Sequence, residues 1–161
     1  MKKSTKDLVI SACVAAIYVA LSLLLAPISF GPIQMRVAEA LIILCFFNKK
    51  YILPLTLACF ITNLMGNYAL YDIILGTLAT FLSALFMSKC KNIYIASLIP
   101  VLFNGLIIPI VFMLQTGVYA IEVYLLDALT VAIGEFVSVS IIGVLLFKLL
   151  SKNNWFKEII E

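Results

Sequence analysis

The sequence contains no histidine and a single arginine, Arg36. Because imidazole is a common ligand in haem, zinc and di-iron sites, its absence argues against such a metal centre. It also removes the side chain that enzymes use most often as a general base. No G-x-x-x-x-G-K-[ST] phosphate loop occurs, so any ATP hydrolysis is expected to take place in another protein. We therefore expect no cofactor, no metal and no catalytic residue in this chain.

Cysteines and charged residues are also sparse. The cysteines are far apart and form no C-x-x-C pair: Cys13, Cys45, Cys59 and Cys90. We interpret them as small buried hydrophobes that form neither a disulfide framework nor a metal site. The net charge of +3 comes from lysines near the ends of apolar segments, which is not the footprint of a nucleic-acid-binding protein.

Apolar residues dominate the composition. The chain is 65% hydrophobic and 12% charged, and its mean hydropathy is +1.20. A soluble domain averages about 45–50% apolar and about 25% charged residues. The sequence lacks the alternating pattern of a membrane barrel, so we expect membrane-spanning helices. The predicted fold is an all-α integral membrane protein, with residues 1–161 forming one membrane domain.

Polar residues, glycines and prolines divide the chain into apolar segments. We predict six membrane helices, at about 7–26, 34–47, 51–66, 70–88, 92–115 and 123–147. The first apolar run is longer than the core of a signal peptide, about 7–15 residues, and we interpret it as a retained helix. The tail after Lys148 is polar and includes Trp155, which we interpret as an anchor at the membrane surface.

Lysines occur in alternate loops of this six-helix topology. They lie at the N-terminus, at 49–50, at 89 and 91, and at 148, 152 and 157, whereas 27–34, 67–69 and 116–122 contain none. By the positive-inside rule both termini are cytoplasmic. A five-helix topology would place lysines on both sides of the membrane.

Arg36 and Glu39 stand at the start of an apolar segment, three residues apart. On a helix these positions share a face, so the two side chains can meet or converge on one ligand. A charged residue at membrane depth is costly and usually marks a functional site. The alternative is an ion pair that anchors the end of a helix at the interface.

The predicted orientation places further polar residues on the outer side. The candidate binding residues are Arg36, Glu39, Asn63, Asn67 and Asp72 near outer helix ends, with Asn104 and Glu135 near mid-membrane. We predict a pocket that opens outward and is closed inward, with aromatic residues at its mouth: Phe30, Tyr68, Tyr71 and Tyr124. Carboxylates accept hydrogen bonds from N–H donors, amides pair with ligand edges that carry both donors and acceptors, and aromatic rings stack on planar groups. This combination suits a small planar polar ligand. The excess of acids over arginine favours a neutral or cationic one.

Each of these residues also has a structural interpretation. Hydrogen bonding between membrane helices, at about 0.6 kcal/mol per contact, would account for polar side chains without any ligand. Asp72 could equally stabilise the start of its helix through the helix dipole.

The first apolar segment contains small residues at every fourth position: Ala12, Ala16 and Ala20. Such a ridge lets a second helix approach closely in lipid. It serves either packing within the chain or contact with a partner subunit.

Four strings give the chain a specific resemblance: F-G-P-I-Q-M-R-V-A-E-A-L, C-F-I-T-N-L-M-G, Y-D-I-I-L-G-T-L-A-T and G-E-F-V-S-V-S. Over roughly residues 7–150 the sequence resembles the queuosine-precursor transporter (QueT) family, which belongs to the substrate-binding S components of energy-coupling factor (ECF) transporters. One departure is Met35-Arg36-Val37-Ala38, where the family pattern has an aromatic residue before the arginine and often a serine before the glutamate.

The resemblance implies a six-helix S component in the bacterial cell membrane that captures queuine or a 7-deazaguanine precursor outside the cell. Its implied partners are a membrane T component and two cytoplasmic ATPase subunits, and the alanine ridge resembles the face that S components present to the T component.

Three alternatives remain open on the residues alone. The first is an S component for another small nutrient. The second is a membrane enzyme with Glu39 or Glu135 as acid or base, although no nucleophile–base pair is visible. The third is a homo-oligomeric channel or small exporter. The confinement of buried charges to the outer half argues against it, because a conduit needs polar lining on both sides.

Overall fold

The computed structural model describes residues 3–26, 35–66 and 70–160, and every regular element among them is a helix. In chain order these are α1 (Lys3–Leu24), η1 (Val37–Ile43), α3 (Leu44–Phe47), η2 (Lys49–Tyr51), α4 (Ile52–Met65), η3 (Asp72–Gly76), α5 (Thr77–Met87), α6 (Ile93–Thr116), α7 (Ile121–Glu135), η4 (Phe136–Gly143), α8 (Val144–Leu150) and α9 (Asn154–Ile160). The elements η1 and η2 are 3₁₀ helices, whereas η3 and η4 have the wider turns of a π helix.

The predicted all-α class is confirmed. In the described ranges three helices are long and apolar enough to cross a membrane: Thr5–Leu24, Ile93–Thr116 and Ile121–Leu150. Two shorter apolar helices are Val37–Phe47 and Asp72–Met87. The protein is therefore a helical membrane protein. That six helices cross the bilayer as one membrane domain stays a prediction.

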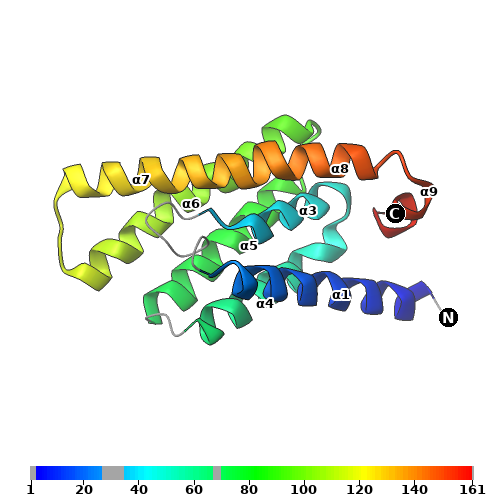
Figure 1. Ribbon diagram of the computed structural model, residues 1–161, viewed down its shortest axis with the longest axis horizontal. Helices are drawn as coiled ribbons and strands as arrows, with labels where there is room; N and C mark the ends of the chain where they lie inside the picture. Colours follow the sequence, from blue (N-terminus) through cyan, green and yellow to red (C-terminus); the bar gives the residue numbers. More distant parts are fainter. Residues whose placement is uncertain (1–2, 27–34, 67–69, 161) are drawn as a thin grey trace.

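The helices pack side by side as long rods (Figure 1). The segments α7, η4 and α8 form one continuous rod along one side of the molecule, and α1 runs along the opposite side. Between them, α4 packs against α1 and α5, and α6 packs against α5 and α7. The 3₁₀ helix η1 lies against η4 and α1, so it occupies the interior of the bundle.

The start of α1 and the helix α9 lie at the same end of the bundle (Figure 1). There, Lys50 forms an ion pair with Asp7 at 2.9 Å between Nζ and Oδ1. The Lys148 ammonium, at the end of the α7–α8 rod, donates to the Tyr94 hydroxyl and lies 4.3 Å from the centre of its ring. We refer to this as the lysine end.

The short helix α9 was not predicted from the polar tail. It is held by its carbonyl groups: the Tyr51 hydroxyl donates to the Ile159 carbonyl at 2.5 Å, and the Asn48 amide donates to that of Ile160 at 3.3 Å. Phe156 is buried, with its ring centre 5.5 Å from that of Phe147. The tail therefore folds back and covers the lysine end.

The apolar core begins beneath this cover and continues into the bundle. Its largest buried members come from six different elements: Tyr18, Ile42, Ile43, Tyr51, Leu55, Met87 and Phe147. Close packing of such side chains leaves little room for water or ions at the lysine end. The interpretation of the cysteines as buried is wrong for two of them, since Cys13 is exposed and Cys90 is half-buried. Cys13 lies on a face of α1 where Ala16 and Ile17 are also exposed, so its thiol stays on the surface.

Candidate functional site

The charged and amide side chains proposed from the sequence are buried wherever the structure describes them. Exposed fractions are 5% or less for Arg36, Glu39, Asn63, Asp72, Asn104 and Glu135. Burying a charge is costly unless it is paired or hydrogen-bonded, so these residues need partners or a ligand. Their burial also argues against the alternative that Arg36 and Glu39 merely anchor a helix end at the membrane surface.

The three buried acids lie where the helices depart from α geometry. Glu39 is in the 3₁₀ helix η1, Asp72 opens the π helix η3, and Glu135 is the last residue of α7, directly before the π helix η4. A π turn inserts extra backbone and redirects the side chains beside it, and such turns are frequent at functional sites. The local backbone geometry therefore sets the direction in which each of the three acidic side chains leaves its helix.

Arg36 is the centre of this arrangement. It immediately precedes η1, and its carbonyl accepts the Glu39 N–H at 2.9 Å. Its guanidinium interacts electrostatically with Glu39, Glu135 and Asp72. The single arginine thus faces acids from three separate rods of the bundle.

The Glu39 carboxylate is held through one of its two oxygens. The Tyr18 hydroxyl donates to Oε1 at 2.5 Å, and the Thr80 hydroxyl donates to the same atom at 3.4 Å. The second oxygen, Oε2, has no hydrogen-bond partner among the described residues. One oxygen is therefore fixed by hydroxyl groups from α1 and α5, while the other is available to accept a hydrogen bond from a ligand.

Asn63 and Asp72 join α4, η3 and α6. The Asn63 amide donates to the Asp72 carbonyl at 3.3 Å, and the end of α6 contributes Gln115, whose amide donates to the Asp72 carboxylate. A methyl group built on Gly76 would stand 3.1 Å from the Asn63 amide nitrogen. The absent side chain at that position therefore leaves room for Asn63.

Several polar atoms of the predicted site residues, and one of Ser138 in η4, are buried without a hydrogen-bond partner among the described residues. They are Glu39 Oε2, Asn63 Oδ1, Asn104 Nδ2, Glu135 Oε2 and Ser138 Oγ. An unsatisfied buried polar group costs about 1–3 kcal/mol and calls for an explanation. Three of the five atoms are acceptors only, so a ligand that satisfied them would present several N–H or O–H donors.

The family model for the QueT transporter matches residues 8–152 of the chain. The chain belongs to the QueT transporter family. A curated relative, the queuosine precursor transporter QueT of Lactococcus lactis subsp. cremoris (strain MG1363), is 38% identical over 169 aligned residues, which cover 92% of this chain and 95% of the relative. No solved structure matches the chain. Family membership makes it a transport protein.

Sequence reasoning missed several residues that this QueT family member brings to the cluster: Tyr18, Cys59, Thr80 and Gln115. Tyr18 left one signal, since tyrosine in membrane helices is usually found at the interfaces and this one lies well inside an apolar run. Serine and threonine are ordinary in membrane helices, where they bond to nearby carbonyls, and gave no signal.

Some predicted residues cannot be placed in the cluster. Asn67, Phe30 and Tyr68 lie outside the described residues. Of the other aromatic residues expected at the mouth, Tyr71 is exposed, and the Tyr124 hydroxyl donates to the Leu106 carbonyl at 3.1 Å, which ties α7 to α6. The expected contact between Asn104 and Glu135 stays a prediction.

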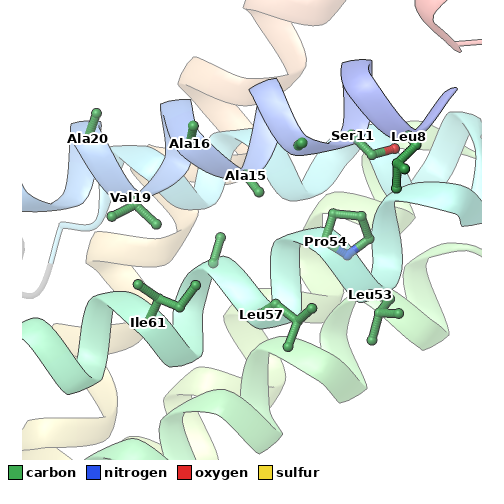
Figure 2. Close-up of a pocket in the computed structure, with 12 residues that line it drawn as sticks. Leu8, Ser11, Ala15, Ala16, Val19, Ala20, Leu53, Pro54, Leu57 and Ile61 are labelled. Carbon is green, nitrogen blue, oxygen red and sulfur yellow. The ribbon is translucent and has the colours of Figure 1, made fainter. Parts of the chain in front are cut away.

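The alanine ridge of this QueT protein borders a groove between α1 and α4, with a volume of about 650 Å³ (Figure 2). Ala12, Ala16 and Ala20 are all exposed. In Figure 2, Ala15 and Val19 point toward α4, whereas Ala16 and Ala20 point away from it. Within the described part of the chain the ridge is therefore exposed along the edge of the groove, and its role as a partner contact stays a prediction.

Proposed function

We propose that this QueT family member is the S component of an ECF importer and captures queuine or a 7-deazaguanine precursor from outside a bacterial cell. The observation that supports this most strongly is the buried cluster around Arg36, in which Glu39 Oε2, Glu135 Oε2 and Asn63 Oδ1 have no hydrogen-bond partner among the residues that the structure describes. The proposal explains why the chain buries more acids than arginines in an otherwise apolar interior: the ligand supplies the missing donors.

The chemistry of a deazaguanine fits the atoms that the cluster leaves open. Its pyrimidine edge presents N–H donors to acceptors such as Glu39 Oε2 and Glu135 Oε2, and its carbonyl would accept from Asn104 Nδ2, or from Arg36 in addition to the interactions that Arg36 already makes. An amine on the substituent at position 7 would add a cation near an acid-rich site. The substrate-binding residues of the proposal are Arg36, Glu39, Asn63, Asn67, Asp72, Asn104 and Glu135.

The proposed topology has six spans, with both termini in the cytoplasm of a multi-pass plasma-membrane protein. Support comes from the lysine end, where Lys50, Lys148, the start of α1 and α9 come together. The positive-inside rule assigns that end to the cytoplasm. The apolar core lies on this side, so the binding site is closed toward the cell interior until partner subunits act.

The proposed partners are a membrane T component and two ATPase subunits. The chain lacks a phosphate loop, so the energy for release comes from the partners. The exposed face of Ala12, Ala16 and Ala20 is the proposed contact with the T component, because small side chains let helix backbones approach closely in lipid.

Equilibrium binding to the purified protein tests the ligand assignment. We expect the wild-type protein to bind 7-aminomethyl-7-deazaguanine or queuine at micromolar concentration, and Glu135→Gln to weaken binding by at least about 10-fold, because a charged acceptor becomes a neutral amide. Glu122→Gln makes the same change at an exposed glutamate in the first turn of α7 and should bind like wild type. Lys152→Ala, at the lysine end, should also bind like wild type.

Two results would contradict the proposal. Absence of deazaguanine binding at micromolar concentration would remove the ligand assignment, and equal binding by Glu135→Gln and Glu122→Gln would remove Glu135 from the site. Competition by riboflavin, thiamine or biotin in the same assay would indicate an S component for another nutrient. Uptake of a labelled deazaguanine by cells with and without the T component tests the partner assignment.

A further inference from the structure

We infer that Tyr18 is a positioning residue of the ligand site, which with Thr80 fixes the Glu39 carboxylate so that Oε2 accepts from the ligand. The inference rests on the proposed function. It assigns a binding role to α1, a helix that contributes no charged residue to the cluster.

The first observation is the hydrogen-bond arrangement at Glu39. The two hydroxyl donors converge on Oε1, at 2.5 Å from Tyr18 and 3.4 Å from Thr80. The shorter distance is in the range of charge-assisted O–H···O⁻ bonds, which are roughly twice as strong as neutral ones. Because Oε1 accepts two hydroxyl groups and Oε2 has no hydrogen-bond partner in the part of the chain that the structure describes, the carboxylate has one fixed and one available oxygen.

The second observation is the burial of the pair. Tyr18 is 1% exposed and Glu39 is 0% exposed, so no bulk water competes for the hydroxyl or the carboxylate. A carboxylate with free rotation about its last side-chain torsion would lose entropy when a ligand ordered it. A carboxylate already held by Tyr18 avoids that loss, which is the general benefit of a preorganised site.

The third observation concerns the two faces of α1. Ser11, Tyr18 and Ser22 form a buried stripe, whereas Ala12, Ala16 and Ala20 are exposed. At about 3.6 residues per turn, or about 100° per residue, the centres of the two sets lie about 140° apart around the helix axis. The face that holds Glu39 is therefore separate from the open alanine face, and a substitution in one can be tested without altering the other.

The test is a double-mutant cycle on 7-aminomethyl-7-deazaguanine binding, with Tyr18→Phe, Glu39→Gln and the double variant. Tyr18→Phe keeps the ring and removes only the donor. We expect it to raise Kd about 10-fold, which corresponds to about 1.4 kcal/mol. In the Glu39→Gln background, where the charge is gone, the same change should raise Kd less than about 3-fold. Thr80→Val should have a smaller effect than Tyr18→Phe, since its bond is longer.

Tyr94→Phe is the matched control. It also removes a hydroxyl that bonds to a charged group, the Lys148 ammonium, but at the lysine end. We expect its Kd to equal that of the wild type. A Kd for Tyr18→Phe within about twofold of wild type would overturn the inference, as would the same loss in both Glu39 backgrounds, because either result would leave no coupling between hydroxyl and carboxylate.

Thermal unfolding of the same four proteins without ligand separates this inference from the proposed function. A coupling between the Tyr18 and Glu39 substitutions is expected there too, since the bond exists before the ligand arrives. If the wild type binds no deazaguanine, the proposed function fails and the binding role of Tyr18 fails with it. If the wild type binds while neither cycle shows coupling, only the inference fails.

Discussion

Replacing Gly143 with alanine tests how closely η1 and η4 approach. A Cβ on Gly143 would stand 2.9 Å from Ile43 Cδ1, 3.2 Å from the Ala40 carbonyl oxygen and 3.3 Å from the Ala40 Cα. The Ile43 methyl can rotate away, but the Ala40 backbone cannot, because it belongs to η1. The methyl group therefore forces the two helices apart.

Overpacking of a close interface typically costs about 1–3 kcal/mol. For a chain of this size, each kcal/mol lowers the unfolding temperature by about 2–4 °C. We therefore expect Gly143→Ala, purified in detergent, to unfold roughly 2–12 °C below the wild type. Binding should weaken as well, since Ala40 follows Glu39 and η4 begins directly after Glu135, so separating the helices separates the two carboxylates.

Gly105→Ala is the matched control. A Cβ there would lie 3.4 Å from the Ala132 Cβ and 3.6 Å from the Ala128 carbonyl oxygen, which are ordinary contacts. Alanine also favours the helical state over glycine, by about 0.5–1 kcal/mol. We expect this variant to unfold at or slightly above the wild-type temperature. Equal unfolding temperatures for the two variants would refute the close approach of η1 and η4.

Three further predictions concern other parts of the molecule. Gly117 ends α6 with φ of 71°, a left-handed conformation, so Gly117→Ala should lower stability by about 1–2 kcal/mol and Gly117→Asn by less, measured by thermal unfolding. Ala16→Leu should abolish co-purification with the proposed T component and leave the Kd for the proposed deazaguanine ligand unchanged, because the ridge lies on the surface (Figure 2). Lys50→Met removes a partly exposed ion pair with Asp7 and should cost less than about 1 kcal/mol in the same unfolding assay.

Each of these three predictions would be contradicted by a specific result. Equal unfolding temperatures for alanine and asparagine at Gly117 would argue against the left-handed conformation. Co-purification of Ala16→Leu with the T component would place the partner contact elsewhere. A large loss of stability in Lys50→Met would show that the lysine end depends on its charges as well as on its apolar packing.

The helical segments could be predicted because long apolar runs with polar breaks have only one stable form in lipid. Whether a segment forms an α, 3₁₀ or π helix could not be predicted. The 3₁₀ turns around Glu39 and the π turns after Glu135 depend on how the helices pack, and no local residue pattern indicates them. The helix α9 was missed because the C-terminal tail that forms it is polar. Its position depends on hydrogen bonds from Tyr51 and Asn48, which lie in a distant part of the chain.

The acids of the site were predictable for a related reason: a charge within an apolar run stands out. Their hydrogen-bond partners were not. Thr80 and Gln115 are common types in common positions, and only the tertiary fold brings them to Glu39 and Asp72. Tyr18 could have been singled out by its depth in the first apolar run, but its partner could not have been named.

The shortness of the η1–α3 rod has a consequence for where a captured molecule sits. Its eleven residues, Val37–Phe47, extend about 20 Å at 2.0 Å per residue in η1 and 1.5 Å in α3. The hydrocarbon layer is about 30 Å thick. In the proposed topology, which puts its lysine-flanked end at the inner surface, the rod would stop about 10 Å below the outer one. A nutrient held at Arg36 would thus sit in a recess below the plane of the lipid headgroups, and it would have to shed most of its hydration to get there.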